Sequence, residues 1–132
     1  MDRRNARACA MKLVYEWIMG GNGGTDTLTG ILEIKPDEKE ADFMNGLYEG
    51  VKLNCSAIDA EISKRLSEKW SLERISKVNL AILRIAVYEL LYTASAPSVV
   101  INEAVELANI YSEDRASAFI NGVLGNMVRS MN

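Results

Sequence analysis

Residues 80–91 read LAILRIAVYELL, and this most apolar run of the sequence decides the fold. Only Arg84, Tyr88 and Glu89 carry polar groups within it. A helix that is apolar on nearly all sides is normally buried at the centre of a protein. The run has to end before Pro97, because the residue that precedes a proline avoids the helical conformation. We therefore predict a central helix here, with other helices packed around it.

The two charged residues of this run, Arg84 and Glu89, need an explanation of their own. A charge inside an apolar helix must be paired with an opposite charge or must reach solvent. A structural ion pair that fixes how the helices meet is the favoured interpretation. Direct contact with a ligand stays open as the alternative.

The segment before the central run also follows helical periodicity. A first helix is expected from Arg3 to Met19, and the glycine-rich stretch 20–24 ends it. A short helix is expected next, and a third helix should run from Pro36 to about Leu53. The apolar residues of these three segments are Ala6, Ala10, Leu13, Val14 and Trp17, then Leu28, Ile31 and Leu32, then Phe43, Met44, Leu47 and Val51.

Three more helices are expected around the central one. A capping box at Ser56–Asp59 should open the first, Ser98 begins the second, and Ser112 should cap the last. The sequence therefore predicts an all-α fold with six or seven helices. Residues 1–132 should form a single domain of two three-helix subdomains that share a core, with a boundary near residue 55 or 70. Core packing is the default expectation for the aromatic residues Trp17, Tyr48, Trp70, Tyr88 and Phe119.

Composition excludes most kinds of catalytic and metal site. The 132 residues contain no histidine and only two cysteines, which do not form a CxxC motif. Zinc sites, histidine-dependent nucleophiles and imidazole acid–base chemistry are therefore not expected. The glycines at 20–24 follow a helix and precede no Lys-Ser/Thr pair, which excludes a phosphate-binding P-loop. Glu103 and Glu106 are more simply a solvated helix face than a metal pair. We expect no enzyme, no cofactor and no membrane span, and a cytoplasmic location.

The start of the chain is a small basic island in an acidic protein. The formal net charge is −3. Residues 1–20, however, contain four cationic residues (Arg3, Arg4, Arg7 and Lys12) and only two acidic ones. Arg3 and Arg7 are four residues apart, so their guanidinium groups should project on one side of the first helix. Such cations usually just solvate a helix face, but arginine forks bind phosphate in a bidentate manner, so binding to an anion or RNA stays open as the alternative.

Four segments together resemble a known protein family. RRNARACA at residues 3–10, followed by Tyr15-Glu16-Trp17, is similar to an RRxARxxA…YxW motif. ILRIAVYEL at 82–90, PSVVINEAVELA at 97–108 and FINGVL at 119–124 are similar to three further motifs of the same family, in the same order. They span nearly the whole chain. This combination resembles the bacterial NusB family of transcription antitermination factors.

The resemblance implies a function as well as a fold. Members of the family are all-α proteins of two three-helix subdomains and are not enzymes. The resemblance implies binding to the boxA segment of nascent ribosomal transcripts, together with the small-ribosomal-subunit protein NusE. The assembly belongs to the antitermination complex of RNA polymerase.

The resemblance also assigns roles to individual residues. Arg3, Arg4 and Arg7 match the family's RNA-binding arginines, and Tyr15 matches a tyrosine that could stack on a base. Phe119 and Arg115 are expected to join that RNA-binding surface. Asn79 is expected to face the protein partner. Four residues of the last two motifs should fix the packing of the last two helices: Asn102, Glu103, Asn121 and Gly122.

Three departures from the family pattern modify these expectations. Asn5 replaces an arginine, Asn79 replaces a charged residue, and the chain stops at Asn132 without a basic tail. We therefore expect weaker RNA binding alone and more dependence on the partner. Two alternatives remain: a detached RNA-binding module of a ribosomal RNA cytosine methyltransferase, and an interaction protein that has lost RNA binding. The sequence does not decide whether a homodimer also forms and hides the RNA-binding face.

Overall fold

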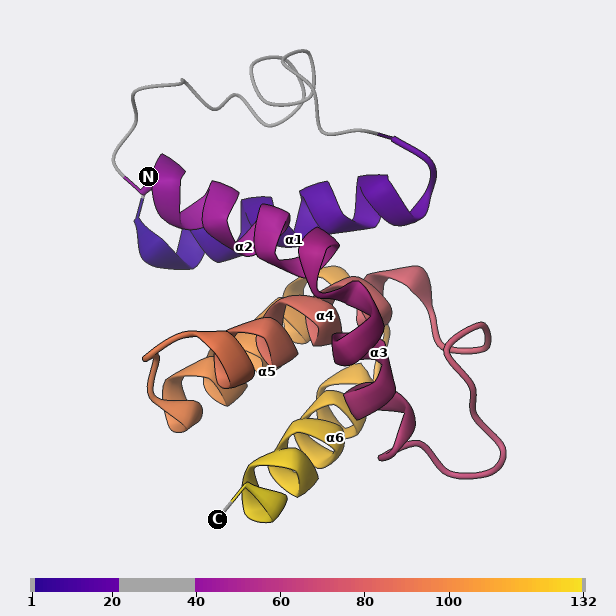
Figure 1. Ribbon diagram of the computed structural model, residues 1–132. Helices are drawn as coiled ribbons and strands as arrows, with labels where there is room; N and C mark the ends of the chain where they lie inside the picture. The colour runs from indigo at the N-terminus through magenta and orange to yellow at the C-terminus, as the bar shows by residue number, and fades with distance from the viewer. Residues whose placement is uncertain (1, 22–39, 132) are drawn as a thin grey trace.

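The computed structural model describes residues 2–21 and 40–131, and this part of the chain is entirely α-helical apart from its loops (Figure 1). It contains six helices and no strand, as the periodicity predicted. Their bounds are α1 Arg3–Ile18, α2 Ala41–Leu53, α3 Cys55–Ser63, α4 Lys77–Tyr92, α5 Pro97–Tyr111 and α6 Ala116–Ser130. The short helix expected at 28–32 and the helix start expected at Pro36 lie outside the described residues.

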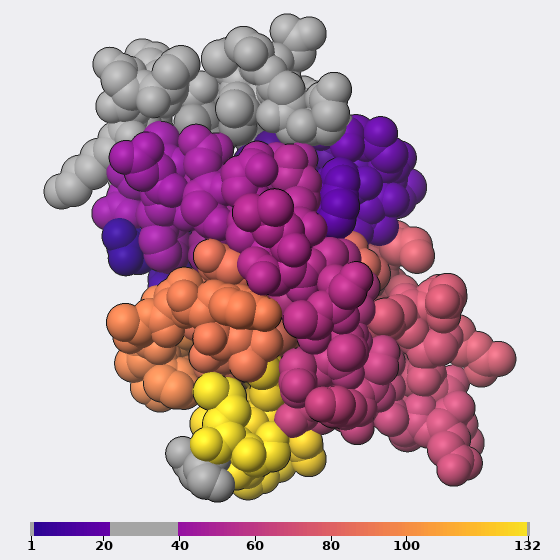
Figure 2. Space-filling view, viewed as in Figure 1, coloured from indigo at the N-terminus to yellow at the C-terminus, as the bar shows by residue number. Residues whose placement is uncertain are grey.

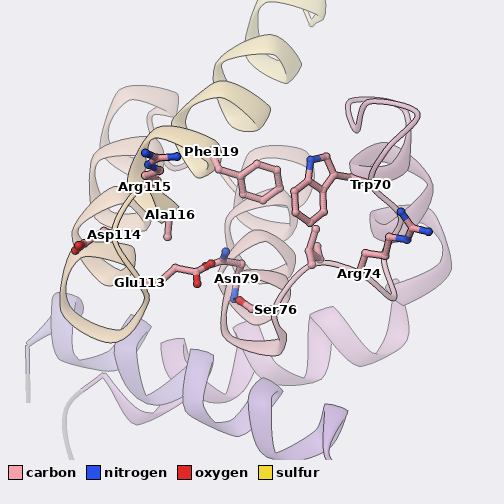
Figure 3. Close-up of a pocket in the computed structure, with 10 residues that line it drawn as sticks. Trp70, Arg74, Ser76, Asn79, Glu113, Asp114, Arg115, Ala116 and Phe119 are labelled. Carbon is pink, nitrogen blue, oxygen red and sulfur yellow. The ribbon is translucent and has the colours of Figure 1, made fainter.

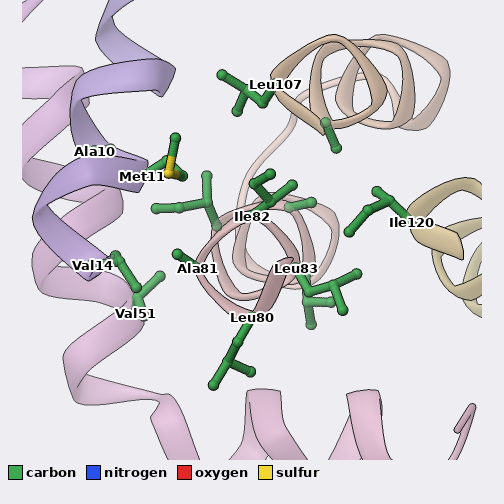
Figure 4. Packing of buried hydrophobic residues seen from close by; sticks show 14 of the residues in the cluster. Ala10, Met11, Val14, Val51, Leu80, Ala81, Ile82, Leu83, Leu107 and Ile120 are labelled. Atoms are coloured by element: carbon green, nitrogen blue, oxygen red, sulfur yellow. The ribbon is translucent and has the colours of Figure 1, made fainter. Parts of the chain in front are cut away.

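Helix α4 occupies the centre of the fold, as its apolar sequence predicted. It contacts each of the other five helices. Figure 4 looks along α4 and shows its side chains pointing outward to several neighbours at once. Ile82 and Leu83 of α4 are completely buried, among residues that include Val14 of α1 and Ile120 of α6. The apolar surface of α4 thus joins all the helices into one core.

Four of the other five helices are arranged as two pairs on either side of α4. Helices α1 and α2 pack against each other, α5 and α6 form the second pair, and α3 lies against α4. The segment 64–76, which links α3 to α4, contains no α-helix and projects from the body of the molecule (Figure 2). Both pairs contribute to the single hydrophobic cluster, so the two halves share their core.

Two of the expected helix starts were wrong. Ser112 does not cap the last helix. It ends α5, and its hydroxyl donates a 2.7 Å hydrogen bond to Asn79 Oδ1, while α6 begins at Ala116. Ser56 does not open α3, which begins at Cys55 directly after a one-residue link from α2. The cap expected at Ser112 was wrong because its hydroxyl is bound to Asn79, a residue distant in sequence that a local cap pattern cannot include.

Close helix packing also occurs at a different glycine from the one expected. Gly122, Asn102 and Asn121 are exposed, and a Cβ atom on Gly122 would meet nothing within 4 Å. The close approach is instead at Gly50 of α2, where a Cβ atom would overlap the ring of Tyr88 from α4. Glycine is therefore required at position 50 because the aromatic ring occupies the space of a side chain.

The two charges of the apolar run 80–91 in α4, Arg84 and Glu89, are both held in bidentate ion pairs, which confirms their structural interpretation. Arg84 donates to both carboxylate oxygens of Asp59 in α3, at 2.9 and 2.8 Å. Glu89 accepts from Arg7 of α1 at 2.8 and 2.9 Å, and also from the Ser95 hydroxyl at 3.2 Å. The Arg7 and Glu89 side chains are only 7% and 2% exposed. This second pair is a buried electrostatic link between α1 and the central helix.

We predict that Gly50→Ala lowers the free energy of unfolding by about 1–3 kcal/mol, because the new methyl group overlaps the Tyr88 ring. Gly46→Ala is the matched control in the same helix, since a Cβ atom there meets nothing within 4 Å. It should stabilise the protein by up to about 1 kcal/mol through helix propensity. Urea denaturation measures both changes, and equal effects of the two substitutions would contradict the packing described at Gly50.

Arg7→Met should lower the free energy of unfolding by about 3–5 kcal/mol, because it leaves Glu89 buried without its cation. Replacing both Arg7 and Glu89 by Met should cost much less than Arg7→Met alone. Arg4→Met is the control, since the Arg4 side chain is 62% exposed and the loss of its ion pair should cost no more than about 1 kcal/mol. If denaturation gave Arg7→Met and Arg4→Met the same cost, the buried pair would not hold α1 to α4.

Candidate nucleic-acid interface

The first turn of α1 presents two of the predicted RNA-binding arginines at the surface. Asp2 caps this helix, accepting a 2.8 Å hydrogen bond from the backbone N–H of Asn5. Arg3 lies 2.9 Å from the Glu40 carboxylate, and its guanidinium stacks over the Phe43 ring with a centroid distance of 3.9 Å. Arg3 therefore leans toward α2 and is already paired with an acidic residue.

Arg4 projects in another direction, across to α5. Its Nε and Nη2 donate to the two carboxylate oxygens of Glu103 at 3.0 and 3.1 Å. The Arg4 side chain is 62% exposed, whereas that of Glu103 is 17% exposed. The hydrogen bond and the negative charge of Glu103 raise the pKa of the Arg4 guanidinium above its ordinary value. This geometry is the bidentate fork that arginine also offers to a phosphate, here occupied by a carboxylate.

Arg7 does not lie on this surface. The four-residue spacing predicted that Arg7 lies beside Arg3, on one side of the helix. In the structure the Arg7 side chain points inward, and its Nε and Nη2 both donate hydrogen bonds to the Glu89 carboxylate. A phosphate could reach Arg7 only if this buried pair separated, so Arg7 is placed as a structural residue and we leave it out of the proposed interface.

Further along α1, Lys12 and Tyr15 are exposed. Lys12 Nζ lies 4.9 Å from the centre of the Tyr111 ring, at the end of α5. Tyr15 lies three residues after Lys12, on the neighbouring turn of the same helix face. Tyr15 was expected at this surface, whereas Tyr111 was not, because an aromatic residue at helical spacing is more often a core residue.

The other predicted residues, Arg115, Phe119 and Asn79, line one groove of about 400 Å³. Figure 3 shows the Phe119 side chain directed toward Trp70 across this groove, with Arg115 at the start of α6. Arg115 has a φ of 77°, a left-handed conformation that is uncommon for a side chain other than glycine. The structure thus brings three of the predicted site residues together, from α4 and from the turn into α6.

Asn79 is less available to a partner than the sequence analysis expected. It is only 5% exposed, and its Oδ1 accepts the hydrogen bond from Ser112. Trp70, which was expected in the core, is instead half exposed at the rim of the groove. Its place in the irregular segment 64–76 explains this error, since helical periodicity places residues only within helices. Arg74 also lines the groove and was not selected.

Within residues 2–21 and 40–131, no three acidic or cysteine side chains are arranged to hold a metal ion. The carboxylate of Glu103, which was expected on a solvated helix face with Glu106, is only 17% exposed and is bound to Arg4. None of the helices in the described part of the chain is both long and apolar enough to cross a membrane.

Comparisons with known proteins agree with the motifs. The chain is 40% identical over 134 residues to the transcription antitermination protein NusB of Clostridium novyi, covering 98% of this chain and 100% of that protein. It is 41% identical to the NusB of Acetivibrio thermocellus, covering 98% of this chain and 90% of that protein.

Solved structures extend the comparison to three dimensions. The NusB of T. maritima superposes with a TM-score of 0.82 at 34% identity, covering 98% of this chain and 92% of that one. NusB from a complex of antitermination factors NusB and NusE with dsRNA superposes with a TM-score of 0.85 at 29% identity, covering 97% of this chain and 96% of that one. The NusB family profile matches residues 4–129, and the chain belongs to the NusB family.

Proposed function

We propose that this protein is a transcription antitermination factor that binds RNA together with NusE. The observation that carries the proposal is the solved relative that holds both NusE and RNA, since it has the same fold over nearly the whole chain. The proposed RNA is the boxA segment of nascent ribosomal transcripts, which the sequence motifs suggested. The action takes place in the cytoplasm, as part of the antitermination complex of RNA polymerase.

The proposed mechanism is adhesion, not catalysis. Arg3 and Arg4 neutralise phosphates, and Tyr15 stacks on an unpaired base. Arg115 and Phe119 extend the same function to the groove at the start of α6. No step requires a nucleophile, an acid–base pair or a cofactor. We therefore propose a protein without enzymatic activity, whose helices hold a few side chains in place for the RNA.

We place NusE on the Trp70 and Asn79 side of the same groove, next to the RNA that we propose for Arg115 and Phe119. The half-exposed Trp70 ring offers apolar surface there, and aromatic residues are enriched in protein interfaces. Asn79 supports the groove from below through its hydrogen bond to Ser112. The methyltransferase module receives no comparable support, because the matched relatives are antitermination proteins along most or all of their length.

The wild-type protein should bind boxA RNA more tightly than scrambled RNA, and NusE should strengthen that binding. Arg4→Gln should weaken it and reduce the slope of log K against log salt by about one, because one phosphate contact is lost. Filter binding at several salt concentrations, with and without NusE, measures these changes. Arg129→Gln, an exposed arginine at the end of α6, is the control. Equal binding of boxA and scrambled RNA would show that the chain does not recognise boxA, and equal affinity with and without NusE would refute the role of the partner.

Glu103→Gln should raise RNA affinity several-fold, because a neutral amide competes less with phosphate for the Arg4 fork. Glu106→Gln removes the same charge from the same helix, but Glu106 forms no hydrogen bond with Arg4. This control should therefore raise RNA affinity less than Glu103→Gln does. In the double variant Arg4→Gln/Glu103→Gln, most of the gain should disappear. Filter binding at one fixed salt concentration compares the four proteins. An equal gain in both glutamate variants would mean that Glu103 acts only through net charge.

A further inference from the structure

Two side-chain contacts show that α1 and α5 run in the same direction along a shared seam. Arg4 contacts Glu103, and Lys12 contacts Tyr111. The second contact therefore lies eight residues further along both helices than the first. Eight helical residues correspond to about 12 Å along the axis. The seam therefore extends from the exposed arginine at the start of α1 to the tyrosine that ends α5.

Lys12 differs from the arginines of the same helix in its electrostatic state. Arg3, Arg4 and Arg7 each have a carboxylate partner. None of the seven ion pairs found among the described residues includes Lys12, which lies over the Tyr111 ring. A cation held against an aromatic face keeps its charge, because the ring does not neutralise it. Lys12 is thus a fixed cation whose charge is still available to an anion.

The aromatic residues around Lys12 add a second kind of binding capacity. Tyr111 is 38% exposed and Tyr15 is 37% exposed. Lys12 contacts the first ring and lies one helical turn from the second. Half-exposed rings beside a cation form the combination that binds single-stranded nucleic acid, since bases stack on the rings and the cation binds the backbone.

We propose that Lys12 and Tyr111 form a second RNA contact, about 12 Å along the α1–α5 seam from Arg4. Lys12 binds a phosphate, and the Tyr111 ring stacks on a base beside the base held by Tyr15. This inference rests on the proposed RNA-binding function and adds two residues to it. The RNA strand then follows the seam from the start of α1 toward the end of α5.

The test uses the full chain with NusE and a fluorescent boxA RNA, and fluorescence anisotropy measures affinity at several salt concentrations. Lys12→Gln should weaken binding several-fold and reduce the salt slope by about one, whereas Lys12→Arg should restore both. Tyr111→Leu should weaken binding about fivefold or more with an unchanged slope, because stacking does not release counterions.

The controls are Lys64→Gln directly after α3 and Tyr92→Leu at the end of α4, which replace an exposed lysine and an exposed tyrosine elsewhere. Thermal unfolding verifies that each variant is folded. If either seam variant binds like its control, the second contact is overturned. Loss of binding in Arg4→Gln but not in Lys12→Gln overturns this inference alone. A wild-type protein that does not bind RNA overturns the proposed function, and the second contact with it.

Discussion

The buried ion pair between Arg7 and Glu89 is the constraint on which the rest of this structure depends. Both charges lie in the interior, where an unpaired charge is strongly destabilising, so α1 can dock on α4 only with Arg7 facing Glu89. This requirement fixes the rotation of α1 about its axis. Arg4, Lys12 and Tyr15 are then directed outward or toward α5 because Arg7 is directed inward. An arginine that touches no ligand thereby positions the residues that we propose to touch RNA.

Much of the surface charge of the described chain is compensated within the molecule. Arg3 lies against Glu40, and Arg4 lies against Glu103. A phosphate that binds Arg4 must displace or share a carboxylate that is itself mostly buried, so part of the attraction is lost to this competition. Such a surface binds RNA less strongly than the number of arginines suggests. This physical reason agrees with a function that relies on a protein partner.

Helical periodicity predicted the position of α4, the bounds of α1 and the end of α2 closely, because it reports which face of a segment is apolar. It could not reveal that Arg7 pairs with a residue 82 positions away, since nothing local distinguishes a buried arginine from an exposed one. The exposed Trp70 was missed for a related reason, as it lies in a segment without helical structure. The arginine pattern suggested a phosphate ligand and the resemblance to a family specified RNA, but only the coordinates separated Arg4 from Arg7.

The end of α5 connects the two surfaces to which we assign binding. Tyr111 is its last residue, and the next residue, Ser112, holds Asn79 beneath the groove through a 2.7 Å hydrogen bond. Three residues later, Arg115 lines the same groove. A partner in the groove therefore rests on the segment that also positions Tyr111 at the seam. If RNA and partner bind as we propose, residues 111–115 connect the two binding surfaces directly along the chain and can couple them. Thermodynamic linkage then requires that the partner change the free energy of RNA binding by the same amount as RNA changes that of partner binding.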